Sequence, residues 1–308
     1  MMTDATTQQA SWYPSIYGPD DQAGALNEIG ADNVVRAAQL VREGRVFDLA
    51  HVLDEHIPAF PGRSFRQYLT TTAYHLNQRS PNAGCDGLGK NNVNWIVEYV
   101  SAPSQIGTHM DGLNHLHIGD RAYNGNRLTD IIEEHGTNRL GIETLPQVVT
   151  RGLLLDIAAV RGVAMMARGD AITPDDAETA LARAGGLTVR RGDAVLFHTG
   201  WGQQWCVDNE GYVDGEPGPG RAVGEWLVDH GIAMTGCDTW SYGAVPAENL
   251  MEPFVVPQTL NAKHGVVVLE NLRLADAAAA GLTQFMFVVS HAKLRGATGA
   301  WIAPLAVI

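Results

Sequence analysis

The stretch SQIGTHMDGLNHLHIGD, residues 104–120, concentrates candidate metal ligands within a few turns of chain. These candidates all occupy odd-numbered positions: Gln105, His109, Asp111 and His115. Because side chains alternate with period two along extended backbone, all four would project to one side of a strand or extended loop. A helix would instead point the last two well away from the first two. Gly107 and Gly112 permit turns that a helix resists, so we predict extended or looped backbone here.

Imidazole nitrogens combined with a carboxylate form a typical site for Zn, Mn or Fe(II), and three protein ligands leave positions open for water and substrate. A divalent cation in such a site lowers the pKa of a bound water and polarises a carbonyl oxygen, which suits hydrolysis. The alternative is that His115 and His117 are surface-loop histidines and that His109 is a buried structural one.

The composition of the whole chain narrows its class and its partners. The 308 residues are 45% hydrophobic and 18% charged, enough to bury a sizeable core without disulfides. Lys and Arg number 21 against 34 Asp and Glu, and the net charge of −13 disfavours nucleic acid and anionic membranes as partners. We therefore expect a small-molecule substrate. We also expect a homodimer or homotetramer, with the apolar C-terminus AWIAPLAVI as one contact between subunits.

The sequence shows no signal for secretion or membrane insertion. The N-terminus lacks a basic region followed by an apolar stretch, and no run reaches the roughly 18 apolar residues that a membrane helix needs. The three cysteines form no CxxC pair, which fits a reducing compartment. We therefore predict a cytoplasmic protein.

Apolar runs alternate with helical patterns along the chain. Nearly continuous apolar runs predict strands at residues 45–53, 95–102, 152–160, 193–200, 231–238, 265–272 and 285–292. Helices are predicted at residues 31–42, 222–231 and 173–185, the last with Thr173 as N-cap and Pro174 in the first turn. This alternation predicts an α/β fold with a mixed sheet or barrel-like core and flanking helices. No linker or repeat divides the chain, so we expect one domain over residues 1–308, with 1–17 as an extended arm.

Residues 105–115 resemble the signature of the metal-dependent cyclase family, His-x-Gly-Thr-His-x-Asp-x-Pro-x-His, which bacterial kynurenine formamidase and isatin hydrolase carry. The matching residues are Gly107, Thr108, His109, Asp111 and His115. Gln105 replaces the first His, and Leu113 replaces the Pro. Further similar segments, among them GLLLDIA, GDAVLFHTGW, GCDTWSYG and HGVVVLENL, extend the resemblance over roughly residues 18 to 290.

This resemblance implies a swivelling β/β/α fold, a divalent metal and hydrolysis of an amide, lactam or ester carbonyl. His109 and Asp111 match metal ligands, and Gln105 takes the place of the first ligand. His115 matches the catalytic general base, and Glu270 an acidic residue that binds a second metal or supports the catalytic site.

A second metal in this family also needs a His about twelve residues before the Glu, where this chain has Gln258. An amide oxygen is a harder and usually weaker donor than imidazole. We therefore predict one metal, Mn or Zn, held by Gln105, His109 and Asp111, and a substrate other than that of kynurenine formamidase.

Aromatic and loop residues supply candidates for the substrate pocket. Phe60, Trp95 and Trp240 could form an aromatic wall, and His51 lies near a loop, IPAFPG, that resembles the family's substrate-side loop. Core packing is the competing interpretation for any large aromatic residue.

Two other functions compete with the hydrolase. One is a non-catalytic small-molecule-binding member of the same fold that has lost turnover. The other is a TIM-barrel amidohydrolase, in which His115 and His117 form an HxH motif and Asp238 is the late aspartate.

Overall fold

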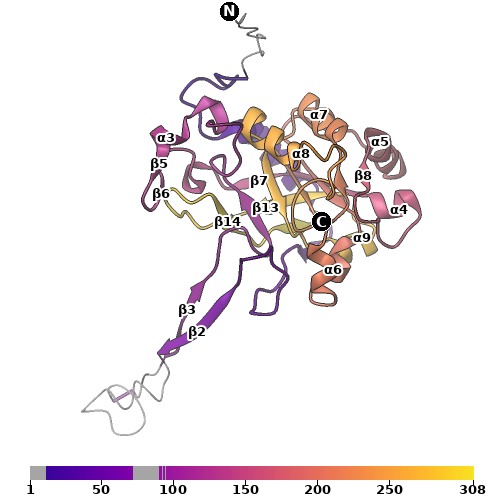
Figure 1. Cartoon of the computed structure of the whole chain (residues 1–308). Coiled ribbons are helices and arrows are strands. Elements are labelled where there is room, and N and C mark those ends of the chain that lie inside the picture. The colour runs from indigo at the N-terminus through magenta and orange to yellow at the C-terminus, as the bar shows by residue number, and fades with distance from the viewer. Residues whose placement is uncertain (1–11, 72–89, 92, 94) are drawn as a thin grey trace, which may run out of the picture.

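A nine-stranded mixed sheet forms the centre of the protein in the computed structural model, which describes residues 12–71, 90, 91, 93 and 95–308. The strands follow the order β1-β15-β13-β7-β9-β11-β12-β4-β14 (Figure 1). Their bounds are β1 Val46–Asp48, β4 His109–Asp111, β7 Val148–Asp156, β9 Ala194–His198, β11 Met234–Cys237, β12 Val267–Glu270, β13 Gln284–Val289, β14 Gly299–Trp301 and β15 Leu305–Val307. The four central strands, β7 to β12 in this order, are parallel, and the flanking strands pair antiparallel.

Apolar side chains alternate between the two faces of this sheet, as the pleat requires. One buried cluster contains Leu153, Leu155, Val195, Phe197 and Val268 and packs against helices α5 (Pro174–Arg183) and α7 (Arg221–Asp229). The other cluster contains Leu154, Leu196, Met234, Val267 and Leu269 and continues into Phe285 and Phe287. Because both faces are covered, the central strands can be apolar at nearly every position.

The remaining helices and short strands surround the sheet. The α-helices are α1 Ala31–Ala38, α3 Leu128–Ile131, α4 Ile157–Arg161, α6 Asn209–Val213, α8 Val255–Gln258 and α9 Ala275–Ala279. Short 3-10 helices are η1 Gly24–Glu28, η2 Tyr123–Gly125, η3 Ile142–Thr144 and η4 Trp201–Gln204, and η5, Thr259–Lys263, is a π-helix. Three two-stranded sheets pair β2 Arg66–Thr71 with β3 Val97–Ser101, β5 Ile132–Glu133 with β6 Gly136–Thr137, and β8 Ala171–Ile172 with β10 Gly218–Pro219.

The mixed sheet and its flanking helices confirm the predicted α/β fold, with differences at element ends. Thr173 caps α5 as predicted, and Pro174 is its first residue. The strand predicted over 152–160 instead ends at Asp156, because that side chain accepts a hydrogen bond from the backbone N–H of Ala159 (3.1 Å) and begins helix α4. Helix α1 ends at Ala38 rather than at residue 42, because the backbone hydrogen bonds beyond its C-terminal cap span three residues instead of four.

The TIM-barrel alternative is wrong, because that fold needs eight parallel strands and here β4 pairs antiparallel with both of its neighbours. The C-terminal residues predicted as a subunit contact lie in β14 and β15 of the sheet, where Ala300 and Ala306 are buried. In the predicted N-terminal arm, residues 1–11 lie outside the described part. Ser15 is tied to η2: its backbone N–H donates to Oδ1 of Asn124 (2.7 Å), and its hydroxyl shares a hydrogen bond with that of Tyr123.

Hairpin β2–β3 extends away from the rest of the molecule (Figure 1). Apolar side chains on it are exposed, among them Tyr68, Leu69, Val97 and Tyr99. The stretch between its strands is outside the described residues, apart from residues 90, 91, 93, 95 and 96. Among the described residues, no helix is long and apolar enough to cross a membrane.

Candidate metal centre

Strand pairing brings the candidate ligands together from opposite ends of the sequence. In the antiparallel pair of β4 and β12, His109 lies directly opposite Glu270. Asp111 is two residues along β4 and therefore projects to the same side as His109. Only His109–Asp111 of the predicted extended segment is a regular strand, and the residues on either side form loops and turns.

Three donor groups converge at this point. Nε2 of His109 lies 3.2 Å from Oε2 of Glu270 and 3.7 Å from Oδ1 of Asp111. One donor atom from each of the three residues lies within 4.8 Å of the others. Nδ1 of His109 donates to the carbonyl of Gly107 (2.8 Å), which leaves the lone pair of Nε2 free to bind a metal. Gly107 reaches this position with φ +62°, a conformation that glycine adopts without strain.

The three side chains are largely buried, and one polar atom each of His109 and Asp111 lacks a hydrogen-bond partner. His109 and Asp111 are each 1% exposed. Nε2 of His109 and Oδ1 of Asp111 make no hydrogen bond, which is costly for buried polar atoms. A divalent cation between them would satisfy both atoms, so the residues present fit a metal site.

The carboxylates perturb the titration of the site. Burial raises the pKa of Glu270, and the nearby charge of Asp111 adds to this effect. Burial lowers the pKa of His109, but the carboxylates of Glu270 and Asp111 outweigh that effect, so that its pKa is raised. Metal binding requires both groups to lose their protons, and these protons compete with the cation.

His115 and Gln105 flank the three donors. The backbone N–H of His115 donates to the carbonyl of Gly112 (3.1 Å), and this turn brings its Nε2 to 3.8 Å from Oδ1 of Asp111. A Cβ at Gly112 would lie 2.5 Å from Oδ1 of Asn114 and 3.2 Å from the carbonyl oxygen of Thr298, so a larger residue would crowd this turn. The side-chain amide of Gln105 donates to Oγ1 of Thr298 (3.1 Å). Of the four ligand candidates in the predicted stretch, His109 and Asp111 lie together, His115 lies beside Asp111, and Gln105 lines the same cavity as Asp111 and His115.

A cavity of about 280 Å³ opens onto these residues. Its walls are Phe60, Arg63, Gln105, Asp111, His115, Leu116, Trp240, Ser241, Phe254, Pro257 and Glu270. The ring centroids of Phe60 and Trp240 lie 5.4 Å apart, and those of Trp240 and Phe254 lie 6.3 Å apart. The site is thus an aromatic cavity whose polar end carries the metal-ligand candidates.

Two predicted substrate contacts lie outside the lining of this cavity. Trp95 is 42% exposed and lies two residues before the first residue of hairpin strand β3. His51 stacks on Trp205 with ring centroids 4.2 Å apart, and burial together with the charge of Arg273 lowers its pKa to about 4. The contact of His51 with the site is made by its backbone: its N–H donates a hydrogen bond to Oγ1 of Thr108, the residue before His109 (2.9 Å). Substrate contact by either residue stays a prediction.

Comparisons with known proteins agree with this architecture. A profile of the Cyclase family, described as "Putative cyclase", matches residues 47–244. The chain belongs to the cyclase family. The resemblance found in the sequence is thereby confirmed, although no curated protein matches the sequence.

Solved structures of similar fold include cyclases and hydrolases. A protein described as a novel cyclase is 28% identical with a TM-score of 0.84, covering 95% of this chain and 98% of its own. Isatin hydrolase A from Labrenzia aggregata, bound to benzyl benzoate, is 21% identical with a TM-score of 0.61, covering 88% and 94%. A predicted metal-dependent hydrolase from Bacillus stearothermophilus is 19% identical with a TM-score of 0.52, covering 86% and 98%. The latter two likenesses show the fold alone.

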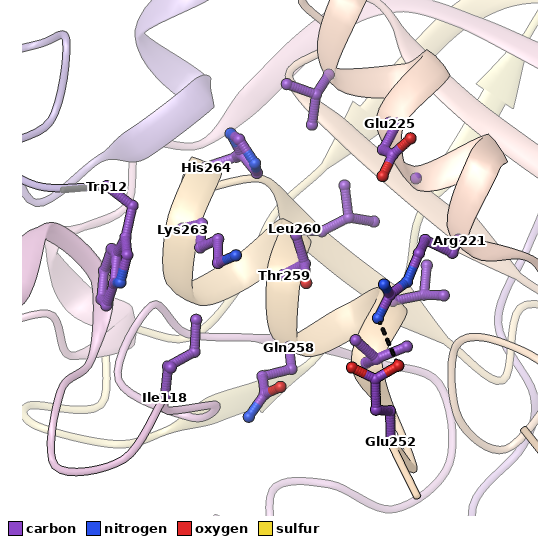
Figure 2. A pocket seen from close by; sticks show the side chains of 14 residues that line it. Trp12, Ile118, Arg221, Glu225, Glu252, Gln258, Thr259, Leu260, Lys263 and His264 are labelled. Atoms are coloured by element: carbon purple, nitrogen blue, oxygen red, sulfur yellow. Dashed lines mark hydrogen bonds and ion pairs between the residues drawn. The ribbon is translucent and has the colours of Figure 1, made fainter. Parts of the chain in front are cut away.

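A larger cavity of about 330 Å³ is lined by residues of helices α7 and α8 and of the π-helix η5 (Figure 2). Trp12, Ile118, Lys263 and His264 surround it, and an ion pair joins Arg221 and Glu252 (2.9 Å) at its edge. It contains none of the donors gathered around His109.

Gln258 belongs to this larger cavity. Its side-chain amide donates to the carbonyl of His117 (2.7 Å). The residue that replaces the family's second-metal His therefore lines a different cavity from the candidate ligands.

Besides Glu270 and Asp238, which the sequence had suggested, the cyclase-family fold brings two residues to the strand ends near the site that sequence reasoning missed: Asp156 and His198. Asp156, His198 and Glu270 each end one of the parallel strands, and Asp238 directly follows another. His198 Nδ1 bonds Oδ1 of Asp156 (2.9 Å), and its Nε2 lies 3.8 Å from Asp238. Ligand sites commonly form at the carboxyl ends of parallel strands, and this rule would have indicated these four residues from the sequence.

The carboxyl of Glu216 is fully buried and supports the wall of the aromatic cavity that contains Trp240 and Ser241. Its Oε2 accepts a hydrogen bond from the backbone N–H of Ser241 (3.1 Å), next to Trp240. Burial raises the pKa of Glu216 well above its usual range, and the charge of Glu270 contributes. This residue stands in the Gly- and Pro-rich loop 215–220, and no motif singled it out.

Proposed function

We propose that this chain is a metal-dependent hydrolase that opens an amide, lactam, lactone or ester bond of a small molecule. The observation that carries the proposal is the convergence of donor atoms of His109, Asp111 and Glu270 at the polar end of an aromatic cavity, where Nε2 of His109 and Oδ1 of Asp111 have no hydrogen-bond partner. Similarity in fold to isatin hydrolase A and to a metal-dependent hydrolase supports the same reaction class.

One divalent cation, Mn or Zn, would be held by His109 and Asp111, with Gln105 and Glu270 as further oxygen donors. Carboxylate and amide oxygens beside one imidazole suit these cations. Bound there, the cation supplies a Lewis acid for the carbonyl and lowers the pKa of a bound water. The proposal of a single metal rests on Gln258, which hydrogen-bonds to the carbonyl of His117 instead of facing the donors.

His115 acts as the general base in this proposal. It lines the cavity, and its Nε2 lies 3.8 Å from Asp111, a distance that places the ring beside the donors. His115 removes a proton from water, the water oxygen bonds to the carbonyl carbon, and the bond from that carbon to nitrogen or oxygen breaks. The departing heteroatom takes a proton, which His115 returns. The products are a carboxylic acid and an amine or alcohol, joined in one molecule when the substrate is cyclic.

The cavity walls orient the substrate. Phe60, Trp240 and Phe254 form a continuous aromatic side that would stack on a planar acyl compound and exclude bulk water. This is the role we propose for the predicted pocket residues Phe60 and Trp240.

Metal analysis combined with a substrate panel tests the proposal. The purified protein should bind one equivalent of Mn or Zn per chain, measured by elemental analysis after dialysis. The loaded protein should then hydrolyse at least one member of a panel of aryl lactones, lactams, formamides and esters, measured by pH-stat. A metal-free protein that is inert on the whole panel would instead favour the non-catalytic binding protein.

A further inference from the structure

One positively charged side chain, that of Arg63, lines the cavity beside the candidate metal ligands and has no role in the proposed reaction. Arg63 lines the cavity together with Asp111, His115 and Glu270. It forms no ion pair with any acidic side chain in the described part of the chain, although acidic residues outnumber basic ones. An arginine directed into a ligand cavity without a carboxylate partner is available to an anion.

A tight turn fixes the position of this arginine. The backbone N–H of Arg63 donates to the carbonyl of Phe60 (2.9 Å), with Pro61 second in the turn and Gly62 third at φ +86°. Pro followed by a glycine of positive φ is the preferred sequence of a type II turn. Both ends of the turn, Phe60 and Arg63, line the cavity.

Two contacts orient the guanidinium within the cavity. Its carbon lies 5.4 Å from the centre of the Phe60 ring, a cation–π distance. Nη1 donates to the backbone carbonyl of Gln105 (2.8 Å). Only one of its five N–H groups is used in this bond, so the planar edge can still bind a carboxylate through two parallel hydrogen bonds.

We propose that Arg63 binds a carboxylate that the substrate carries in addition to the bond that is cleaved. Resting on the proposed function, this inference defines the substrate class as planar aromatic acyl compounds with a second, anionic group. The aromatic body would lie against Phe60 and Trp240, the reacting carbonyl would face His115, and the carboxylate would meet Arg63. Asp111 and Glu270 would not repel such a substrate, because the cation they hold offsets their charge.

A pair of matched ligands tests the proposal without turnover. Isophthalate and monomethyl isophthalate differ by one negative charge, and each has a carboxylate that can reach the metal. We expect the metal-loaded protein to bind isophthalate about 10- to 100-fold more tightly, as a charged hydrogen-bonded pair provides. Binding is measured by calorimetry and by quenching of tryptophan fluorescence.

The preference should depend on Arg63 alone. Arg63→Gln should bind both ligands with nearly equal affinity, while its affinity for monomethyl isophthalate stays unchanged and shows that the variant is folded. Arg66→Gln is the matched control: it removes the same charge three residues later, on the exposed hairpin, and should keep the wild-type preference. Equal binding of the two ligands by the wild type, a preference that survives in Arg63→Gln, or failure to bind isophthalate would each overturn the proposal.

Turnover separates this inference from the proposed function. If the protein is a hydrolase of this class, 5-carboxyphthalide should be opened with a higher kcat/KM than phthalide, and Arg63→Gln should remove the difference. Inertness toward both lactones and toward the whole panel of lactones, lactams, formamides and esters, together with a normal Arg63-dependent preference for isophthalate, would reject the proposed reaction and keep the carboxylate site. Equal kcat/KM on both lactones in the wild type would reject the carboxylate site and keep the hydrolase.

Discussion

Replacement of His115 by alanine tests whether the proposed general base is distinct from the proposed metal ligands. The donor atoms of His109, Asp111 and Glu270 gather without His115, so His115→Ala should keep the full metal content of the wild type. General base catalysis contributes about 10²- to 10⁴-fold in rate. The variant should therefore lose about that factor in kcat, equivalent to about 3–5 kcal/mol of the activation barrier.

The fold should tolerate this substitution. The His115 side chain is 26% exposed, and its nearest ionic contact, to Asp111, is 3.8 Å away, too long for a hydrogen bond. Removing such a side chain should cost less than about 1 kcal/mol of unfolding free energy. Thermal denaturation of the metal-loaded variant measures this cost, and elemental analysis of the same sample gives its metal content.

His117→Ala provides the matched control. The side chain of His117 bonds to the carbonyl of Asn114 (3.0 Å) and does not line the cavity. This variant should keep wild-type kcat. Loss of the metal from His115→Ala would make His115 a ligand, and a kcat within threefold of the wild type would exclude it as the general base.

Three further predictions concern stability and the support of the site. Asp156→Asn removes a carboxylate that, against the opposing effect of burial, holds the pKa of His198 above its usual value. The stabilising interaction between Asp156 and protonated His198 is fully present below the pKa of histidine in the unfolded chain and is lost as pH rises through the raised pKa of the folded state. Asp156→Asn should therefore lower the Tm more near about pH 5.5 than near about pH 8.5. An equal loss of Tm at both pH values would contradict this. Glu216→Gln replaces a buried carboxyl whose pKa is raised by burial, and the stability of the wild type should decline as pH rises above the usual carboxyl pKa. The Tm of the variant should therefore rise relative to that of the wild type between about pH 5 and pH 8. A difference in Tm that stays constant over this range would show that Glu216 does not titrate in this way. Gly299→Ala would place a Cβ 2.8 Å from the carbonyl of Met110 and 2.7 Å from the amide of Gln105, which should cost about 1–3 kcal/mol in chemical denaturation; a variant as stable as wild type would show that strands β4 and β14 separate easily.

Local patterns predicted much of the fold and part of the site. Buried parallel strands are apolar at nearly every position, which made β7, β9, β11 and β12 visible in the sequence. The alternation of His109 and Asp111 predicted a strand with both side chains on one face, and the structure has this strand. The Thr173-Pro174 capping signal placed the start of α5 correctly.

The remaining features depend on contacts between distant residues. No local pattern says that Glu270 pairs with His109, because strand register is set by the complete sheet. The apolar C-terminus was interpreted as an oligomer contact, since a short apolar segment that completes a sheet looks the same in sequence as one that meets a partner. The homodimer or homotetramer stays a prediction, which light scattering of the purified protein can test. Arg63 was missed because its importance arises from a turn that joins it to Phe60 and from its place in a cavity formed by several loops.

His109 and Glu270 lie opposite each other on two neighbouring strands, so a cation bound to both would also stabilise the fold. These residues come from different thirds of the chain, and β4 and β12 meet only when the sheet is complete. A cation bound to both acts as a reversible cross-link between the strands. At a free concentration 100 times its Kd, it adds about 2.7 kcal/mol to the stability of the folded chain. If the proposed metal binds here, its scarcity would lower the resistance of the protein to unfolding and proteolysis as well as its proposed activity, and the amount of folded protein would follow the metal supply.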